Sequence, residues 1–254
     1  NLIRDTFRRS KYPDVILPFT VLRRIDCVLA PTKQEVLETH NRYKGRIAPE
    51  ALEKQLRRTS GHAFYNTSKY DFDRLHQDPD ALADNLRRYI NGFSPNMRQV
   101  LERFDFDNTI AKLDDVDLLY LVLQEFRNID LHPENLDNQA MGDVFQELIR
   151  RFNEASNENP GEHFTPPDVV SLMTRLVMAG DDEFVEQPYR NIKVYDPCCG
   201  TGGMLTTAKK LIAQRNEQAH VFLYGQEVNP ETWAIAKAEL FMLSEDGRDA
   251  ENIA

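Results

Sequence analysis

The stretch DPCCGTGG at residues 196–203 decides the fold, because it places an acid and a glycine-rich turn directly after a short β-prone run. That run is IKVYD, residues 192–196, and a helical stretch at residues 204–215 follows the turn. Glycine lets the backbone approach a ligand and adopt dihedral angles that a side chain forbids. The amides that open the following helix then face the ligand, at the sheet edge where open α/β folds bind theirs. We therefore expect a ligand site at this turn.

The next residues repeat the same order of strand and helix. HVFLYG, residues 220–225, is a second β-prone run. Asn229 followed by Pro230 then opens another helix, with a cap residue and a proline in the first turn. Strand, helix, strand, helix is typical of a parallel α/β sheet. Because only about two strands are visible, the sequence predicts the first part of such a fold.

The spacing of the glycines narrows the choice of ligand. No Gly-Lys-Ser/Thr follows, so the turn is not a phosphate loop, and GTGG departs from the dinucleotide pattern G-x-G-x-x-G. Glu227 stands just past the second β-prone run, where a carboxylate can accept hydrogen bonds from both hydroxyls of a ribose. A lone glutamate in a loop is more often simply solvated. Together with the glycine turn one βα unit upstream, Glu227 is predicted to bind a ribose.

A third element precedes these two, GEHFTPPD at residues 161–168. Thr165 stands before two prolines with Asp168 three residues on, which predicts a capped helix start that continues through residues 169–178. Capping explains these residues without any function. His163 is not expected to be a catalyst or a metal ligand, because no nucleophile motif and no second ligand accompany it.

The front of the chain is predicted to be helical, in a domain of residues 1–134. Apolar residues recur at three- and four-residue steps in three stretches, residues 15–29, 80–90 and 115–126. Arginine pairs occur at 23–24, 57–58 and 87–88, and such pairs are usually solvated helix surface.

A loop rich in Asp, Asn and Pro, residues 130–138, is the predicted domain boundary, so that the second domain comprises residues 135–254. The helix after this loop carries an apolar stripe that we expect to face the core: Met141, Val144, Phe145, Leu148, Ile149 and Phe152.

Composition limits the function classes. The 254 residues are 41% hydrophobic and 28% charged, as in a globular protein, and no signal peptide or membrane span is visible. The three cysteines, Cys27, Cys198 and Cys199, form no disulfide framework and indicate the cytoplasm. The net charge of −10 argues against a self-sufficient DNA binder. Asn1 and Ala254 are expected to be cuts in a longer protein.

Together and in this order, three pieces resemble an amino-group DNA methyltransferase, with the modification subunit of type I restriction–modification systems as the family most similar. They are FTP at 164–166, DPxxGTGG at 196–203, and Glu227. YPDVILP at 12–18 and LRRI at 22–25 resemble the opening helices of that subunit. The resemblance covers most of the chain, strongly in residues 161–203, fairly in the opening helices and weakly between about 30 and 110.

The resemblance implies an α-helical N-terminal domain followed by the start of an α/β Rossmann-like domain that binds S-adenosyl-L-methionine. Its methionine part would contact Glu162, His163, Phe164, Thr165, Pro166 and Pro167. Its amino and carboxylate groups would contact the turn residues Asp196, Cys198, Cys199, Gly200, Thr201 and Gly202, with Asp196 near the ammonium and the cysteines as small packing residues. Glu227 would bind the ribose. No metal is implied.

One motif of the family is absent. Its catalytic tetrapeptide is Asn-Pro-Pro followed by an aromatic, but the Asn-Pro pairs here continue as Gly161 and Glu231. The resemblance implies that this motif lies beyond Ala254, where it would polarise the adenine amino group and stack on the flipped base. We therefore assign no catalytic residue and expect the 254 residues alone to be inactive.

The resemblance implies methylation of the N6 amino group of adenine in duplex DNA, with a specificity subunit reading the target and a restriction subunit in the same complex. The choice of N6-adenine over N4-cytosine rests on the likeness alone. Two other readings stay open: a methyltransferase acting on protein glutamine or a small molecule, and a non-catalytic helical interaction module. Titration with S-adenosylmethionine separates the last from the others.

Overall fold

The computed structural model describes residues 3–4, 7–155, 165–180, 182–244 and 246–254. Its elements in chain order are η1 (Arg9–Lys11), α1 (Tyr12–Leu29), η2 (Ala30–Thr32), α2 (Lys33–Tyr43), α3 (Pro49–Ser60), α4 (Phe72–His76), η3 (Pro79–Ala81), α5 (Leu82–Asn91), α6 (Pro95–Arg103), α7 (Phe106–Asp114), α8 (Leu119–Asn128), α9 (Asn138–Ala155), α11 (Pro167–Val177), α12 (Asp182–Val185), β1 (Asn191–Asp196), α13 (Gly203–Arg215), β2 (His220–Gly225), α14 (Pro230–Leu243) and η4 (Arg248–Asn252).

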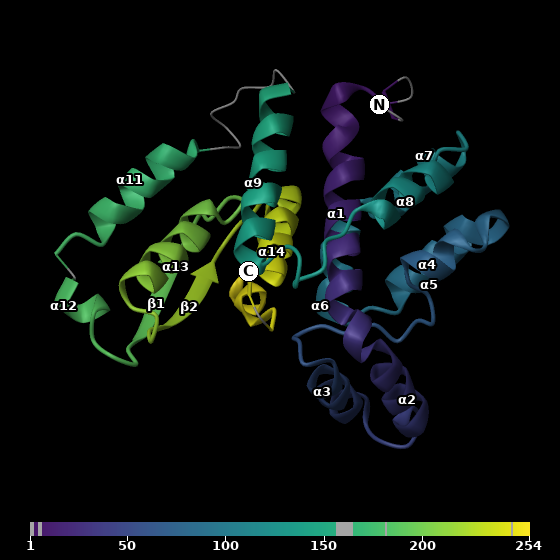
Figure 1. The fold of residues 1–254 in the computed structure, drawn as a ribbon, viewed down its shortest axis with the longest axis horizontal. Helices are drawn as coiled ribbons and strands as arrows, with labels where there is room; N and C mark the ends of the chain where they lie inside the picture. Colours follow the sequence, from purple (N-terminus) through teal and green to yellow (C-terminus); the bar gives the residue numbers. More distant parts are fainter. Residues whose placement is uncertain (1–2, 5–6, 156–164, 181, 245) are drawn as a thin grey trace.

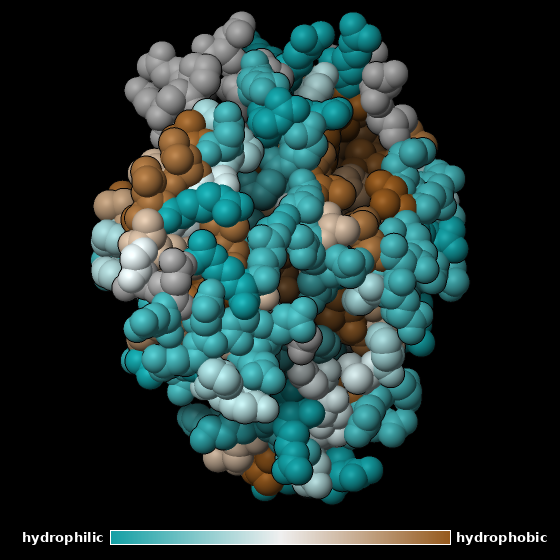
Figure 2. Space-filling view, turned by 60° about the vertical axis from the view of Figure 1, so that its left-hand side comes forward, coloured by the Kyte–Doolittle hydropathy of each residue, from teal (hydrophilic) through white to brown (hydrophobic). Residues whose placement is uncertain are grey.

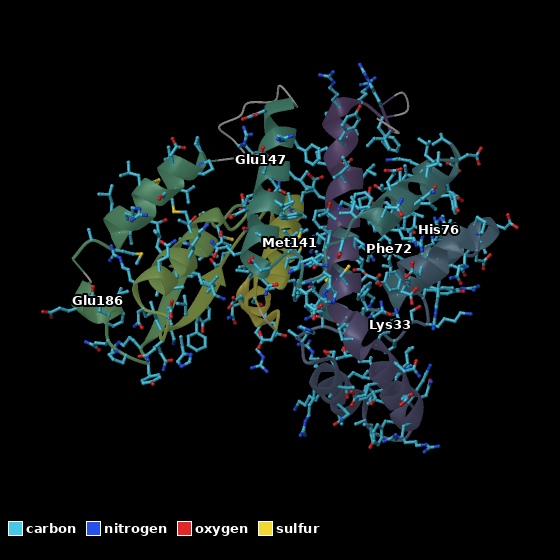
Figure 3. The ribbon with its side chains drawn as sticks, in the orientation of Figure 1. Lys33, Phe72, His76, Met141, Glu147 and Glu186 are labelled. Atoms are coloured by element: carbon cyan, nitrogen blue, oxygen red, sulfur yellow. The ribbon has the colours of Figure 1, made fainter. Side chains whose placement is uncertain are left out.

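A helical half and an α/β half lie on either side of three adjacent helices (Figure 1). The helices α2 to α8 form one side, and the strands with α11 to α13 form the other. Helices α1, α9 and α14 pack against one another between them, and Met141 of α9 lies fully buried beside α1 (Figure 3). The predicted order, a helical domain followed by an α/β domain, is confirmed. The exact boundary between residues 134 and 135 stays a prediction.

The predicted strand, helix, strand and helix are confirmed at the centre of the α/β half. β1 and β2 pair in parallel, in register from Asn191 opposite His220 to Asp196 opposite Gly225. α13 connects the two strands and packs against both. Ile253 forms a parallel bridge with Gly225, so the end of the chain lies beside β2 on the edge away from β1.

The opening helix α1 is buried on nearly all sides, whereas its spacing predicted one buried face. Phe19, in the middle of α1, packs edge-on against Phe106 at 5.0 Å and stacks on Phe126 at 5.3 Å. Leu17 and Val21 are also buried, although they lie outside the predicted face of Val15, Ile16, Phe19, Leu22, Ile25 and Val28. Helices from both halves surround α1, so periodicity alone understated its burial.

The prediction that the first arginine pair is solvated surface is wrong for Arg24. Its side chain is 0% exposed and donates to the carbonyl oxygens of Leu131 and Leu136 at 2.6 and 2.8 Å, and to the side-chain oxygen of Asn138 at 2.7 Å. The loop before α9 supplies the two carbonyl oxygens, and Asn138, the first residue of α9, supplies the third acceptor. A guanidinium satisfies several such acceptors at once, which explains its burial.

Two smaller predictions are also corrected. The helix predicted for residues 115–126 begins only at Leu119, and Val116 is 42% exposed. The amide of Leu118 bonds to the carbonyl of Leu113 at the end of α7, with Asp117 at φ 57°, so the chain turns here instead of continuing a helix. In the stripe on α9, Val144 is 42% exposed although Met141 and Phe145 are fully buried.

Thr165 does not cap the helix that follows it. The N-cap residue of α11 is Pro166, and no side-chain hydrogen bond caps this helix. Thr165 therefore lies one residue too early to accept from the amides of the first turn. Asn229, in contrast, caps α14 as predicted, because its side-chain oxygen accepts from the amides of Glu231 and Thr232 at 3.0 and 3.1 Å.

Helix α11 packs on α13 with one face and exposes large apolar side chains on the other. Val170 and Thr174 are buried in this contact. The exposed apolar residues of α11 are Val169, Leu172, Met173, Leu176 and Val177. Figure 2 brings this side of the molecule forward and shows apolar side chains at the surface among polar ones. Within the described part of the chain, no helix is both long enough and apolar enough to cross a bilayer.

Candidate cofactor site

The glycine turn after β1 bends sharply into α13. Gly200 has φ 57° and Gly202 has φ 91°, and both angles lie in the left-handed region that favours glycine. The amide of Gly202 donates to the carbonyl oxygen of Cys199 at 2.8 Å, which closes the turn. The amide of Cys199 donates to the carbonyl oxygen of Gln226 at 2.9 Å, which ties the turn to the segment after β2. The start of α13 thus faces the carboxyl ends of both strands.

Glu227 points into this turn. One carboxylate oxygen accepts from the amide of Gly200 at 3.1 Å, and the other accepts from the amide of Asn229 at 2.6 Å. A carboxylate offers about four lone-pair positions, so two remain for hydroxyl donors of a ligand. The structure therefore brings together the acid and the glycine turn that the sequence placed 27 residues apart.

Asp196, the last residue of β1, adds a second negative charge where the turn begins. Its carboxylate accepts from the amide of Cys198 at 3.0 Å. The pKa of the Cys199 thiol is raised to about 11, chiefly by burial and also by the negative charges of Asp196 and Glu227. The carboxylates of Asp196 and Glu227 therefore both accept hydrogen bonds from backbone amides of the same turn. Such a site favours positively charged groups of a ligand.

Gly225, which the sequence did not single out, is required by close packing. A Cβ atom here would lie 2.8 Å from the side chain of Ile253 and 2.9 Å from the sulfur of Cys199. Its carbonyl oxygen accepts from the amide of Ala254 at 3.0 Å, and the carbonyl oxygen of Ala254 in turn accepts from the amide of Glu227 at 2.9 Å. The pairing of residues 253–254 was not visible in the sequence, because two residues are too short for a strand pattern.

A hollow of about 360 Å³ borders Glu227. Its walls come from the loop before α14 and the first turns of that helix, from α6 of the helical half, and from residues 253–254. The lining residues are Gln99, Arg103, Glu227, Val228, Pro230, Trp233, Lys237, Ile253 and Ala254. This volume lies within the range of small-molecule sites. Both halves of the molecule therefore contribute to the space beside the predicted ribose ligand.

The other predicted site residues are placed less closely. Thr201 lies within the glycine turn and is partly buried. Thr165, Pro166 and Pro167 are exposed where α11 begins. Glu162, His163 and Phe164 lie outside the described residues. Within the described ranges, no cluster of His, Cys, Asp and Glu is suited to hold a metal ion.

The two adjacent cysteines of the turn are expected to differ sharply in reactivity. Cys198 is exposed, whereas Cys199 is buried and at pH 8 only about one of its thiols in a thousand is ionised, given a pKa of about 11. Iodoacetamide at pH 8 should therefore label Cys198 much faster than Cys199, as fragmentation mass spectrometry of the shared peptide can measure. Unfolded protein, in which both thiols are accessible, is the control. Equal labelling rates in the folded protein would contradict the burial of Cys199.

Two family models match this chain and together cover most of it. The model described as "HsdM N-terminal domain" matches residues 1–126, and the model described as "N-6 DNA Methylase" matches residues 136–253. The first match covers the helical half, and the second covers α9, the sheet and the glycine turn.

The curated relatives that the chain resembles are methylase subunits of type I restriction enzymes. The chain is 34% identical over 97 residues to the type I restriction enzyme HindI methylase subunit of Haemophilus influenzae, a match covering 38% of this chain and 20% of that protein. It is 20% identical over 262 residues to the MjaIX methylase subunit of Methanocaldococcus jannaschii, covering 96% of this chain and 44% of that protein. The chain thus spans less than half the length of these relatives.

A solved structure shares the fold. The crystal structure of the type I restriction–modification system methyltransferase subunit from Streptococcus thermophilus superposes with a TM-score of 0.69 at 19% identity. The superposition covers 99% of this chain and 55% of that one. With both halves of the chain matched in the order that the fold shows, the protein belongs to the family of methyltransferase subunits of type I restriction–modification systems.

Proposed function

We propose that this chain binds S-adenosyl-L-methionine between the glycine turn and Glu227. The observation that carries the proposal is the convergence of acids from two neighbouring strands on one turn, with Glu227 3.1 Å from the amide of Gly200 and beside a hollow. The ligand has a positively charged ammonium and sulfonium, a ribose with two hydroxyls, and no phosphate. Two carboxylates suit such a ligand better than they suit a dinucleotide.

Different residues bind different parts of the ligand. Glu227 accepts hydrogen bonds from the ribose hydroxyls, and the hollow beside it takes the adenine. Asp196 lies near the ammonium, and the amides of the turn Cys198–Cys199–Gly200–Thr201–Gly202 face the carboxylate at the start of α13. Cys198 and Cys199 serve as small residues of the turn and not as nucleophiles. Residues 162–167 contact the methionine part.

We further propose that the protein methylates N6 of adenine in duplex DNA as the modification subunit of a type I restriction–modification complex in the cytoplasm. The cofactor supplies an activated methyl group, so catalysis rests chiefly on positioning and desolvation. This chain contributes the cofactor site, and we assign it no catalytic residue; alone it is expected to be inactive. Its charge of −10 supports target recognition by a separate specificity subunit, with a restriction subunit in the same complex.

The cofactor proposal is tested by isothermal titration of the chain with S-adenosylmethionine. Glu227→Ala should weaken binding about 100-fold, because it removes charge-assisted hydrogen bonds of about 1.5–3 kcal/mol each. Glu231→Ala is the matched control, an exposed glutamate in the first turn of α14 that should leave binding unchanged. Equal binding by Glu227→Ala and the control would place the ribose elsewhere.

The substrate proposal is tested with the full-length protein in the presence of a specificity subunit. Labelled methyl groups from S-adenosylmethionine should appear in duplex DNA, and nucleoside digestion should recover them as N6-methyladenine. Recovery of the label as N4-methylcytosine would show that the target base is cytosine and not adenine. Label in protein glutamine or a small molecule, with none in DNA, would replace this proposal by another methyltransferase class.

A further inference from the structure

The segment 246–254 holds Glu227 in place from one side. Ile253 pairs in parallel with Gly225, and the carbonyl oxygen of Ala254 accepts from the amide of Glu227 at 2.9 Å. The position of the Glu227 backbone at the end of β2 therefore depends on where this segment lies. Its carboxylate then reaches the glycine turn from that fixed point.

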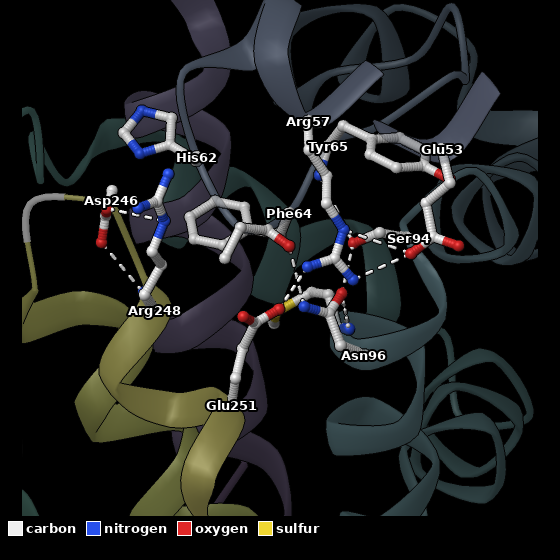
Figure 4. Close-up of polar contacts among 12 residues, drawn as sticks. Glu53, Arg57, His62, Phe64, Tyr65, Ser94, Asn96, Asp246, Arg248 and Glu251 are labelled. Carbon is white, nitrogen blue, oxygen red and sulfur yellow. Dashed lines mark hydrogen bonds and ion pairs between the residues drawn. The ribbon is translucent and has the colours of Figure 1, made fainter. Parts of the chain in front are cut away.

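The helical half holds the same segment from the other side (Figure 4). The amide of Ala63 donates to the carbonyl oxygen of Asp246 at 2.6 Å. Arg57 of α3 forms an ion pair with Glu251 of η4, three positions before Ala254. Arg57 is itself oriented by Glu53, one turn earlier on α3, with 2.8 Å between a guanidinium nitrogen and a carboxylate oxygen.

Contacts within the α/β half complete the support of the segment. Lys209 of α13 pairs with Asp249, and Ala250 is fully buried. The segment is thus attached to α3, to α13 and to β2 within nine residues. Little backbone remains between these attachments to absorb a displacement, so a shift of Glu251 is passed on to Ala254.

We propose that Arg57 is a positioning residue for the cofactor site, acting through Glu251 and segment 246–254 on Glu227. The inference rests on the proposed function, because it uses Glu227 as the ribose ligand. The helical half thereby sets the geometry of a ligand site to which Arg57 itself does not belong. The sequence suggested that Arg57 and Arg58 are both solvated surface residues, but their surroundings differ. Arg57 links the two halves through its ion pair with Glu251. Arg58 is exposed and has no ion pair among the described residues.

The partial exposure of the ion pair makes this role separable from stability. The side chains of Arg57 and Glu251 are 27% and 40% exposed, and exposed pairs of this kind contribute little to global stability. Arg57→Gln is therefore expected to fold with an unchanged thermal midpoint. Arg58→Gln, at the next position of the same helix, is the matched control.

The test compares two ligands in each variant by isothermal titration. One is S-adenosylhomocysteine, and the other is its analogue with a 2′,3′-dideoxyribose, which offers Glu227 no hydroxyls. Arg57→Gln should weaken S-adenosylhomocysteine about fivefold, a size typical of coupling between sites. The dideoxy analogue should bind Arg57→Gln, Arg58→Gln and the unaltered chain equally.

A double-mutant cycle tests whether Arg57 acts on Glu227 through Glu251. Glu251→Gln should reproduce the fivefold loss, and Arg57→Gln with Glu251→Gln together should lose no more than either alone. The inference is overturned if Arg57→Gln binds S-adenosylhomocysteine as tightly as Arg58→Gln does. It is also overturned if the losses of affinity from Arg57→Gln and Glu251→Gln multiply in the double variant. An equal loss of affinity for both ligands overturns it as well, because such a loss indicates a general loosening of the fold. Failure of the unaltered chain to bind S-adenosylhomocysteine at all removes the proposed function, and with it this inference. Binding that requires Glu227 but ignores Arg57 removes the inference alone.

Discussion

Replacing Arg24 by methionine is expected to lower the free energy of unfolding by about 3–5 kcal/mol. The guanidinium is fully buried and donates to Leu131, Leu136 and Asn138. Methionine fills similar space but leaves three oxygens without their donors. Each buried acceptor left unsatisfied costs about 1–3 kcal/mol. Urea unfolding followed by circular dichroism measures the loss.

The control for Arg24→Met is Arg58→Met, which removes an exposed arginine and should change the free energy of unfolding by less than about 0.5 kcal/mol. Arg24→Lys tests geometry, because an ammonium retains the charge but cannot reproduce the planar fork of a guanidinium. Lysine should therefore restore only part of the lost stability. A loss below about 1 kcal/mol for Arg24→Met would show that water reaches these oxygens and that the arginine does not hold the loop.

Glu239→Gln is expected to stabilise the protein increasingly as the pH rises from 5 to 8. Glu239 is 1% exposed on α14, and the pKa of its carboxyl is raised to about 8. Burial is the largest cause and the charge of Asp143 adds to it, while hydrogen bonds from Gln146 and Thr206 act in the opposite direction. The folded protein keeps a proton on Glu239 in this window, whereas the unfolded chain releases it above its ordinary pKa. Stability is therefore lost as the pH rises, and the loss continues through the folded pKa.

Glutamine keeps a neutral polar group beside Gln146 but does not titrate. The variant should therefore gain on the order of 3 kcal/mol relative to the unaltered chain between pH 5 and pH 8. Urea unfolding at several pH values measures this difference, in which other titrating groups cancel. Glu231→Gln, exposed on the same helix, should show no such trend. Parallel pH profiles for Glu239→Gln and the unaltered chain would mean that Glu239 is ionised in the folded state.

Much of the geometry of the candidate cofactor site was predictable because its parts are local. A strand that ends in an acid, a turn with glycines at 200 and 202, and a capped helix at Asn229 are each specified by a few adjacent residues. Parallel pairing of β1 and β2 then follows from the length of the connecting helix. Placing Glu227 past the second strand brought it to the same sheet edge as the turn, and its contact with Gly200 agrees with that expectation.

The long-range contacts were not predictable, since they join residues whose local patterns are unremarkable. Arg24 and Arg23 are neighbours of the same type, and only the position of the loop before α9 decides that one is buried. Glu251 and Arg57 lie 194 positions apart, and nothing in the local sequence of either distinguishes it from a solvated surface residue. The sequence around Gly225 gave no sign that a glycine is required there, because the requirement comes from the packing of Ile253 against it.

The sequence by itself determined the order of the two halves, the two strands with their crossover helix, and the acids and glycines of the turn. These features depend on backbone propensity and short spacing, which act within a few residues. Only the tertiary structure decided which arginines are buried, how segment 246–254 supports Glu227, and that the helical half lines the hollow beside it. Those outcomes depend on desolvation and on contacts between distant segments, and both exist only once the chain is folded.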